Sequence, residues 1–575
     1  MSRALSSLIA RLSPLEVLGD TEVAIEGLAY DSRAVRPGYL FFALPGIHDD
    51  GERWIDAAIA AGARAIVHRD RLVARRPDVS YLRVADPRAA MSPLADSFYR
   101  SPSRDLTVIG VTGTEGKSTT VYLIWQLLNL AGFKAGFFST VMSDTGAGEV
   151  PNPEHQTTPE APAVHRMLAS MREAGMDFAV VEASSHGLSP RTSRLADVAF
   201  DAGVLMNVRH EHLEFHGSWE QYRHDKANLF RALDAATHDK IRLGRRIEVG
   251  AFGVACADDP SASYFAAATL RPTLRFSSKG GEADFRALEI ESDAEGNSFV
   301  LECPAEIRGL AGRRGDEGSG DARTSDARTS DSRRGDPRAR FDARIELPGA
   351  FNVDNCLAAI ATVAGAAGIP VASLVALLPR LRPVLGRMTR VDRGQPFEVI
   401  VDYAHTPSSF EAILPPLRHR AKGRLIAVFG SAGERDTAKR PQQGAIAARY
   451  ADILLLSDED PRGEEPMAIL KEIAAGVAGG VVASSTVGSA GALFLIPDRK
   501  IAIRKAFSLA VPGDIVLLLG KGHENSIIYR DGPVPWNEIE EARAALEELG
   551  FDGEGADPSD ASQMAGAIDH DNSNH

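Results

Sequence analysis

The chain has 575 residues, of which 44% are hydrophobic and 25% are charged, a balance typical of soluble globular proteins with about three or four domains. The formal net charge of −14 argues against general nucleic-acid binding, which requires a basic surface. No apolar run is long enough to span a bilayer, and the N-terminal residues lack a secretory signal. Three widely spaced cysteines predict reduced thiols. We therefore expect a cytoplasmic protein without membrane insertion.

The first predicted unit covers residues 1–104. It contains "VAIEGLAYDSRAVRPGYLFFALPG" and then an alanine-rich helix followed by a strand, "WIDAAIAAGARAIVHR". The segment "DLTVIGVTG" opens a second unit, predicted over residues 105–346, in which apolar runs alternate with helical segments. Strands that alternate with helices predict an α/β unit with a mainly parallel sheet.

A glycine-rich turn follows the first strand of the second unit. In "VIGVTGTEGKSTTVYLI", Gly113 and Gly116 precede Lys117 and Ser118 at a helix start. Glycines let backbone N–H groups turn towards a phosphate, the lysine reaches phosphate oxygens, and the hydroxyl can hold Mg²⁺. The pattern predicts a phosphate-binding loop. Val111 takes the place of the usual first glycine, so a glycine-rich turn without nucleotide stays an alternative.

Two further features of this unit could bind metal. Glu182 follows a buried strand in "VVEASSHGL", and a carboxylate there would complete a Mg²⁺ site beside a phosphate loop, although alone it would be a solvated loop residue. His212 and His216 are four residues apart and could share a helix face to bind zinc. Their order, H-L-E-F-H, differs from the H-E-x-x-H of metalloproteases, which disfavours a zinc hydrolase.

The remaining chain contains a biased segment, a third unit and a tail. Residues 308–340 are charged and rich in Gly, Ser and Asp, which predicts a disordered insertion, with a regulatory or partner-binding segment as the alternative. A third unit is predicted over 347–551, where apolar runs such as "FEVIVDYAH" and "DIVLLLGKGHE" stop at polar residues. Ligands of open α/β sheets bind beyond such strand ends, so we expect a second binding surface here. Residues 552–575 predict a disordered tail.

A series of short motifs occurs in the order seen in one family. They include "GVTGTEGKSTT", "HQTTPE", "EASSHGL", "HEHLEFHGSWEQYRHDKANLF", "LPGAFNVDN", "VDYAHTPSSF", "GERDTAKRP" and "GKGHE", with "YDSRAVRPGYLFFALPG" at the front. Outside the insertion and the tail, the chain resembles the Mur ligases, and most closely the MurE type. The resemblance implies three α/β domains: a UDP-substrate-binding N-terminal domain, a central P-loop domain with a parallel sheet that binds ATP, and a Rossmann-like C-terminal domain that binds an amino acid.

The resemblance also implies a reaction in peptidoglycan precursor synthesis, and hence a role in cell shape and division. ATP, with Mg²⁺, would phosphorylate the D-glutamate of UDP-MurNAc-L-Ala-D-Glu. The amine of a free diamino acid would then attack the acyl phosphate and release phosphate. Because negative charge accumulates in both steps, preorganised cations should dominate catalysis. A monomer is the default expectation.

Positions that match the family motifs imply roles for individual residues. The implied catalytic residues are Lys117, Glu182, His212 and Lys226. The implied metal ligands are Ser118, Glu182, His212 and Lys226 as a carbamate. The implied ATP-binding residues are Gly113, Thr114, Glu115, Gly116, Lys117, Ser118, Thr119, Asn355, Arg387, Asp402 and His405. Those for the UDP substrate are Ser32, Thr157, Thr158, Ser184 and Arg194, and those for the amino acid are Arg435, Asp460, Pro461, Arg462, Gly520 and Glu524.

The sequence departs from the family pattern in three places. E-H-L-E replaces D-H-L-D around His212, Glu115 replaces an asparagine of the loop, and two extra residues would let Arg191 take the role of Arg194. Alternatives that stay open are a MurF-type ligase, a folylpolyglutamate synthase, and a P-loop protein that binds nucleotide without ligating anything.

The segment "SDEDPRGEEP" gives conflicting signals on the amino acid. Arg462 favours a second carboxylate, as in meso-diaminopimelate. Asp460 favours a bare ammonium and would repel a carboxylate about 4 Å away by roughly 1–4 kcal/mol. The sequence narrowly favours meso-diaminopimelate, with L-ornithine or L-lysine as alternatives.

Overall fold

The computed structural model divides the chain into two compact units, residues 1–382 and 383–575. Most of the predicted insertion and tail lies outside the described residues, and His212 does too. The strand β20 begins at Arg338, so the last three residues of the range predicted as an insertion belong to a strand. No helix in the described part of the chain is long and apolar enough to cross a membrane. The described residues are 2–45, 50–70, 72, 75–152, 156–209, 213–234, 238–242, 245–293, 295–305, 338–477 and 492–553.

The N-terminal part of the first unit is a five-stranded sheet in the order β2-β7-β6-β5-β4. The strands β4 to β7 are parallel, and β2 is antiparallel to β7. Its elements are β1 (Arg3–Ala4), α1 (Leu5–Ile9), β2 (Glu16–Leu18), β3 (Ala24–Ile25), β4 (Gly27–Ala29), β5 (Tyr39–Phe42), α2 (Ile55–Ala60), β6 (Ala65–His68), β7 (Ser80–Arg83) and α3 (Pro87–Phe98).

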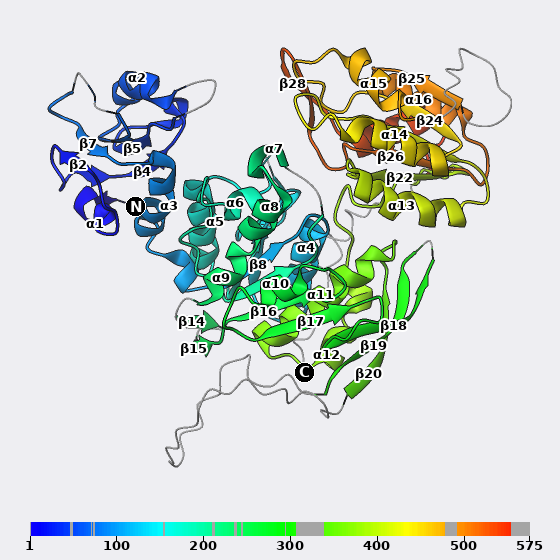
Figure 1. Ribbon diagram of the computed structural model, residues 1–575, viewed down its shortest axis with the longest axis horizontal. Coiled ribbons are helices and arrows are strands. Elements are labelled where there is room, and N and C mark those ends of the chain that lie inside the picture. Colours follow the sequence, from blue (N-terminus) through cyan, green and yellow to red (C-terminus); the bar gives the residue numbers. More distant parts are fainter. Residues whose placement is uncertain are drawn as a thin grey trace, which may run out of the picture. The chain divides into compact units, whose positions relative to one another are not determined.

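The rest of the first unit is built on an eleven-stranded sheet in the order β11-β10-β9-β12-β8-β13-β16-β17-β18-β19-β20 (Figure 1). The strands from β9 to β18 in this order are parallel, so β12, β8 and β13 end at the same edge. The strands are β8 (Thr107–Thr112), β9 (Ala135–Phe138), β10 (Met142–Asp144), β11 (Val150–Pro151), β12 (Phe178–Glu182), β13 (Ala202–Leu205), β16 (Phe252–Cys256), β17 (Thr273–Ser277), β18 (Phe285–Ser292), β19 (Asn297–Pro304) and β20 (Arg338–Ile345).

The helices of this part connect the strands and cover the sheet. A separate hairpin, β14 (His238–Arg242) with β15 (Arg245–Val249), comes before β16 in the chain. The helices are α4 (Lys117–Leu130), α5 (Ala161–Glu173), α6 (Ser185–Leu188), α7 (Leu213–His216), α8 (Trp219–Lys226), α9 (Asn228–Arg231), α10 (Ala262–Ala266), α11 (Phe351–Ala367) and α12 (Val371–Val375).

The first unit extends beyond the domain boundary expected at residue 346. The apolar helix α11 packs against α4, and this contact keeps it in the first unit. The unit ends at Arg382, whose backbone N–H and C=O pair with the side-chain amide of Gln126 at 2.9 and 3.0 Å. The guanidinium of Arg382 also pairs with Glu149 at 2.8 Å. The last residue of the unit is therefore fixed to α4.

The second unit is a six-stranded sheet in the order β21-β22-β26-β23-β24-β25 (Figure 1), parallel except for β21. This is the doubly wound arrangement expected for the C-terminal domain. Its strands are β21 (Thr389–Arg390), β22 (Glu398–Asp402), β23 (Leu425–Phe429), β24 (Ile453–Leu456), β25 (Ala492–Leu495), β26 (Ile515–Leu519), β27 (Ser526–Tyr529) and β28 (Gly532–Pro535). Its helices are α13 (Pro407–Arg420), α14 (Lys439–Tyr450), α15 (Pro466–Ala474), α16 (Arg499–Leu509) and α17 (Glu538–Glu548).

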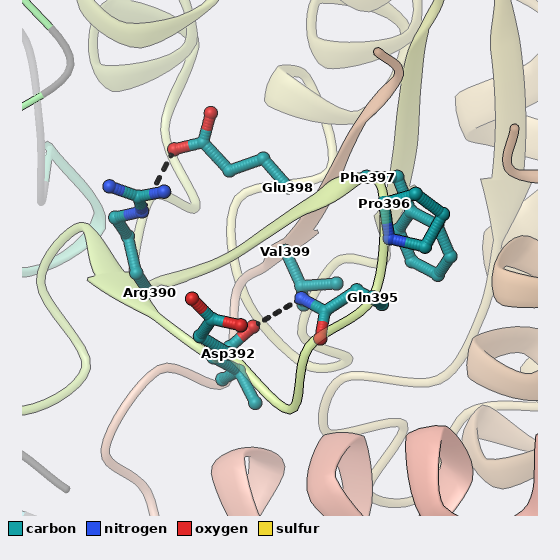
Figure 2. A pocket seen from close by; sticks show the side chains of 8 residues that line it. Arg390, Asp392, Gln395, Pro396, Phe397, Glu398 and Val399 are labelled. Atoms are coloured by element: carbon teal, nitrogen blue, oxygen red, sulfur yellow. Dashed lines mark hydrogen bonds and ion pairs between the residues drawn. The ribbon is translucent and has the colours of Figure 1, made fainter. Parts of the chain in front are cut away.

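A cavity of about 260 Å³ lies at the turn between β21 and β22 (Figure 2). Arg390 and Glu398, which line it, form an ion pair at 3.3 Å. Glu398 begins β22 and Asp402 ends it, so the cavity lies at the amino end of the strand. None of the predicted site residues lines it. The cavity is therefore away from the strand ends where ligands of such sheets bind.

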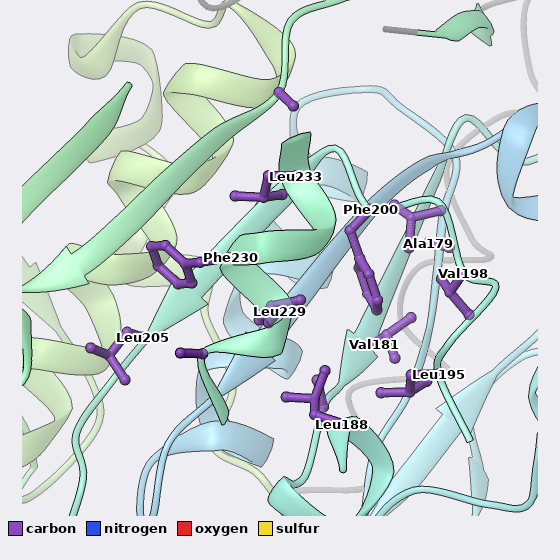
Figure 3. Close-up of a cluster of buried hydrophobic side chains, with 14 of the residues drawn as sticks. Ala179, Val181, Leu188, Leu195, Val198, Phe200, Leu205, Leu229, Phe230 and Leu233 are labelled. Carbon is purple, nitrogen blue, oxygen red and sulfur yellow. The ribbon is translucent and has the colours of Figure 1, made fainter. Parts of the chain in front are cut away.

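The central strands of the eleven-stranded sheet are continuous apolar runs because both faces of the sheet are buried there. Figure 3 shows side chains from β12, such as Val181, packed with Leu229 and Phe230 from α9. Every residue of β8, β12 and β13 is buried, because helices cover both faces of a parallel sheet. The polar residues that follow these strands are therefore confined to the strand ends.

Candidate active site

The predicted phosphate-binding loop connects β8 to α4, at the edge where β8, β12 and β13 end. Gly116 has φ 81°, in the left-handed region, and a Cβ at this position would lie 2.5 Å from Oδ1 of Asn355. Thr120 of α4 donates to the same oxygen at 3.2 Å. The glycine thus allows α11 to place Asn355 directly against the loop. Two residues that the sequence separates widely, both predicted to bind ATP, are neighbours in the structure.

Two lysines donate to the carbonyls of this loop. Nζ of Lys117 donates to the carbonyl oxygen of Thr114 at 2.8 Å, and Nζ of Lys226 donates to that of Gly113 at 2.7 Å. Lys226 is almost fully buried, and its ammonium lies 4.4 Å from the ring centroid of Tyr222. Two positive charges therefore lie where a phosphate-binding loop needs them.

Glu182 ends β12 and is buried, as the prediction of a strand-end carboxylate requires. Its carboxylate accepts from the Ser118 hydroxyl at 2.9 Å and from the backbone N–H and hydroxyl of Thr140 at 2.7 and 3.0 Å. Ser118 and Glu182, both predicted Mg²⁺ ligands, are thus in direct contact. A hydroxyl beside a carboxylate offers the hard oxygen donors that Mg²⁺ prefers, so this pair fits the ion.

The histidine-rich segment does not support the zinc alternative. His216 contacts Oδ2 of Asp225 through Nδ1 at 2.8 Å and the Ser185 hydroxyl through Nε2 at 3.1 Å. Both ring nitrogens of His216 therefore have hydrogen-bond partners, and His212, the other histidine of the pair, lies outside the described residues.

One other group of potential metal ligands occurs in the described part of the chain. Donor atoms of Cys256, Asp258 and Asp354 lie within 4.8 Å of one another. Burial raises the pKa of the Cys256 thiol to about 12, so the thiol is protonated at neutral pH. Asp258 accepts from the Ser277 hydroxyl at 2.7 Å. The chemistry of this group favours a structural polar cluster.

Asn207 contacts the loop and was not among the predicted site residues. Its side-chain oxygen accepts from the backbone N–H groups of Thr114 and Glu115 at 3.2 and 2.9 Å. Its amide nitrogen donates to the carbonyl of Glu115 at 3.2 Å. Asn207 therefore fixes the shape of the loop. Asn207 is the second residue after the apolar run "DAGVL". A polar residue just past a strand end is the sequence signal that could have identified it.

The residues predicted to hold the UDP substrate gather beside Glu182. Thr158 donates to the Glu182 carbonyl at 2.9 Å and contacts the Ser184 hydroxyl at 2.9 Å. Arg194 donates to the Thr158 carbonyl at 2.8 Å and pairs with Glu160 at 2.9 Å. Thr158, Ser184 and Arg194 thus form one continuous polar cluster.

The other predicted substrate residues have separate surroundings. Arg191 stacks over the ring of Phe215 and donates to the carbonyl of that residue, so Arg194 is the arginine that reaches Thr158. Ser32 begins the short 3₁₀ helix Ser32–Ala34 of the N-terminal sheet region. Thr157 precedes Thr158 in the chain and is partly exposed.

Three predicted ATP-binding residues lie in the second unit. Asp402 ends β22 and accepts from the backbone N–H groups of Met388 and Ala404, both at 2.7 Å. The guanidinium of Arg387 lies 4.7 Å from the ring centroid of Tyr403, and Nδ1 of His405 contacts the Tyr403 carbonyl at 2.9 Å. Arg387, Asp402 and His405 therefore form one group around the end of β22.

The predicted amino-acid residues follow β24 and β26. The buried ammonium of Lys521, which the sequence analysis did not single out, pairs with Asp460 at 2.8 Å and with Glu524 at 2.5 Å. Burial disfavours the charge of Lys521, but these two carboxylates hold its pKa above the usual range. Arg462 has φ 53°, and its guanidinium is 3.9 Å from Asp460.

Glycines allow close packing around this second group. Gly520 has φ 101°, and a Cβ there would lie 3.0 Å from Oε2 of Glu459. A Cβ at Gly433 would lie 2.0 Å from the carbonyl oxygen of Pro461. Arg435, two residues after Gly433, is exposed. The structure therefore brings Asp460, Gly520 and Glu524 together, with Pro461 and Arg462 next to them.

Three family models match the chain. The Mur ligase family catalytic domain matches residues 24–99, the Mur ligase middle domain matches 111–363, and the Mur ligase glutamate ligase domain matches 386–522.

Proteins named UDP-N-acetylmuramyl-tripeptide synthetase are similar over most of their length. That of Treponema pallidum is 51% identical, covering 91% of this chain and 93% of the relative, and that of Treponema denticola is 45% identical, covering 95% and 98%. A Geobacillus thermodenitrificans protein named UDP-N-acetylmuramoyl-L-alanyl-D-glutamate–2,6-diaminopimelate ligase is 36% identical, covering 95% and 99%.

A solved structure of a protein with that ligase name is also similar. It is 26% identical, with a TM-score of 0.58, and the match covers 96% of this chain and all of that one. MurF from Acinetobacter baumannii has the same fold, with a TM-score of 0.62 at 17% identity, covering 95% of this chain and 99% of that one. The chain belongs to the Mur ligase family, whose members are ATP-dependent amide ligases.

Proposed function

We propose that this chain ligates a free diamino acid to the D-glutamate of UDP-MurNAc-L-Ala-D-Glu, with hydrolysis of ATP to ADP and phosphate. The names of the relatives at 36–51% identity support this substrate class. The observation that carries the proposal is the contact between Ser118 and Glu182 beside a loop to which Lys117 and Lys226 donate. A switch protein that only binds nucleotide would not need the buried Lys226.

Phosphoryl transfer to the substrate carboxylate requires that negative charge be neutralised. Ser118 and Glu182 would hold Mg²⁺, which supplies charge neutralisation at the phosphates when bound. Lys117 would exchange its bond to the Thr114 carbonyl for the γ-phosphate, and the first N–H groups of α4 would add the favourable end of the helix dipole. The predicted ligand His212 lies outside the described residues.

The polar cluster of Thr158, Ser184 and Arg194 would orient the UDP-linked dipeptide. It adjoins the carbonyl of Glu182, so a substrate held there would lie close to the phosphate-binding loop. The acyl phosphate formed on D-glutamate would then be attacked by the amine of the diamino acid. The predicted amino-acid residues follow β24 and β26 in the second unit.

Lys226 has a proposed role as a carbamate. Carbamylation would replace its positive charge by an anionic oxygen donor able to bind metal or water. Replacement by alanine should abolish turnover, and excess bicarbonate should not restore it. Lys134, which is exposed, offers the control variant Lys134→Ala. Near-normal activity of a folded Lys226→Ala protein would contradict the carbamate role.

The central experiment measures phosphate release by the purified protein with ATP, Mg²⁺ and UDP-MurNAc-L-Ala-D-Glu. We expect release only when a diamino acid is present, with formation of the tripeptide product. Assays with meso-diaminopimelate, L-ornithine and L-lysine would run side by side. If no amino acid stimulates release, the ligase proposal fails, and a nucleotide-binding protein or a ligase of another substrate becomes the better explanation.

A further inference from the structure

The inference concerns the carboxylates that follow β24 and β26, and it rests on the proposed function. We call this group the acidic edge and define it as Glu459, Asp460 and Glu524. Glu459 and Asp460 are 6% and 7% exposed, and the side chain of Glu524 is 18% exposed. Three carboxylates are thus held together away from bulk water, where each needs a counter-charge or a hydrogen-bond donor.

Lys521 is the ammonium at the centre of this edge. It pairs with Asp460 and with Glu524, so one positive charge is shared between two carboxylates. Asp460 also accepts from the backbone N–H of Ile528 at 3.0 Å, and Glu524 accepts from the Tyr403 hydroxyl at 3.3 Å. These two carboxylates are therefore well supplied with donors.

One carboxylate oxygen of Glu459 lacks such a hydrogen-bond donor among the described residues. Its Oε2 is buried and has no hydrogen-bond partner among the described residues. Burial raises the pKa of the Glu459 carboxyl more than the positive charge of the nearby Lys439 lowers it. The ammonium of Lys439 donates to the His405 carbonyl at 3.2 Å. Burial raises the pKa of Glu524 as well. Burial is the largest cause of both shifts, so both carboxyls lie where their negative charge is disfavoured unless a cation comes close.

Arg462 does not require a second carboxylate on the ligand. Its guanidinium is 3.9 Å from Asp460, too long for a hydrogen bond, and its buried Nε has no partner among the described residues. Every α-amino acid carries one α-carboxylate, and Arg462 can serve that group. A second carboxylate placed at Arg462 would lie close to Asp460, whose carboxylate is 3.9 Å from that guanidinium.

We infer that the amino acid ligated by this chain ends in an ammonium group with no carboxylate beside it, as in L-ornithine or L-lysine. Such an ammonium brings three N–H donors and a positive charge to an edge that contains an unpaired carboxylate oxygen. The distal carboxylate of meso-diaminopimelate would meet like charge at the same place. Glu459 and Asp460 are the residues that set this preference.

The first test compares kcat/KM for L-ornithine, L-lysine and meso-diaminopimelate in the ligation assay with the full chain, ATP, Mg²⁺ and the UDP-linked dipeptide. We expect L-ornithine or L-lysine to exceed meso-diaminopimelate at least about tenfold, the discrimination that one like-charge contact supplies. Equal or better use of meso-diaminopimelate overturns the inference and leaves the proposed function intact. The absence of stimulation by all three amino acids contradicts the proposed function instead.

The second test uses Glu459→Gln and Asp460→Asn, which keep the shape and remove one charge each. Each should raise KM for the preferred amino acid about tenfold or more, change kcat little, and reduce discrimination against meso-diaminopimelate. Glu540→Gln on the exposed face of α17 is the matched control, with no change expected. Equal effects on all three amino acids would show that these carboxylates only support the fold, and the wild-type comparison decides the inference even if a variant is unstable.

Discussion

The carboxyl ends of the two parallel sheets differ in the charge they collect. Around the ends of β8 and β12, Lys117 and Lys226 donate to loop carbonyls, and the carboxylate of Glu182 accepts three hydrogen bonds. At the ends of β24 and β26, two carboxylates, Asp460 and Glu524, pair with the ammonium of Lys521, and a third, Glu459, lies beside them. The same topology therefore places the phosphate-binding lysine Lys117 at one edge and a group of carboxylates at the other. The fold determines where a ligand binds, and the strand-end residues determine its charge.

The largest expected effect is on the cationic side of this comparison. Lys117→Ala removes a preorganised positive charge from the transferred phosphoryl group and should slow ADP formation about 10³-fold. Lys117 is only partly buried, so the melting temperature should change little. Lys134→Ala provides the surface control. A loss of less than about tenfold would mean that Lys117 is not the cation that acts on the phosphate.

The acidic side depends on a buried ion pair. Arg499 pairs with Glu538 at 2.6 Å and donates to the carbonyls of Asp458 and Leu519, which places it between β24 and β26. Glu538→Gln leaves a buried guanidinium uncompensated and should lower the free energy of unfolding by about 3–5 kcal/mol.

Urea unfolding of the second unit measures this effect. The control is Glu548→Gln, whose partner Arg504 belongs to a surface pair and whose loss should change the free energy of unfolding little. Similar losses for both variants would show that burial does not distinguish the two pairs.

Removal of the carboxylate charge at the anion-binding edge should have a smaller and different effect. Glu182→Gln keeps an acceptor for Ser118 and Thr140 but weakens the oxygen donor set for Mg²⁺. The Mg²⁺ concentration for half-maximal activity should rise about 10–100-fold, and excess Mg²⁺ should restore part of the rate. An unchanged Mg²⁺ requirement would exclude Glu182 as a ligand.

The smallest expected effect is a pH dependence of stability next to the acidic edge. Burial raises the pKa of Asp458 from 3.8 to about 6, although the Tyr529 hydroxyl donates to it at 3.2 Å. The folded protein therefore binds this proton more tightly than the unfolded chain does. Its contribution to stability is present below the unfolded pKa and is lost as the pH rises through the folded pKa.

Asp458→Asn removes this titration. The stability of the variant relative to the wild type should be greater near pH 8 than near pH 4, by about 1–2 kcal/mol. Thermal or urea unfolding at both pH values measures the difference. A difference that is the same at both pH values would show that Asp458 does not titrate in this range.

The features that the sequence predicted best are local ones. The turn with Gly116, Lys117 and Ser118 can be recognised because its residues are adjacent in the chain and a helix starts there. The family resemblance and the α/β fold class are confirmed by the domain matches and the parallel sheets. The individual site roles stay predictions, and the one for His212 lies outside the described residues.

The features that the sequence could not predict depend on strand order and on packing. Asn207 reaches the loop because β13 lies beside β8, and Lys521 reaches Asp460 because both follow strands of one sheet. The end of the first unit depends on the packing of α11 against α4. The helix α11 is apolar on nearly every side, so its sequence does not indicate which neighbour it joins.

The attachment of Arg382 has a mechanical consequence. The side chain of Gln126 clamps the backbone of Arg382 to α4, and Glu149 holds its guanidinium. Any pull along the chain at Pro383 is therefore borne first by α4, the helix that begins at Lys117. Tension on the connection between the units would therefore act on α4, the helix that follows the phosphate-binding loop.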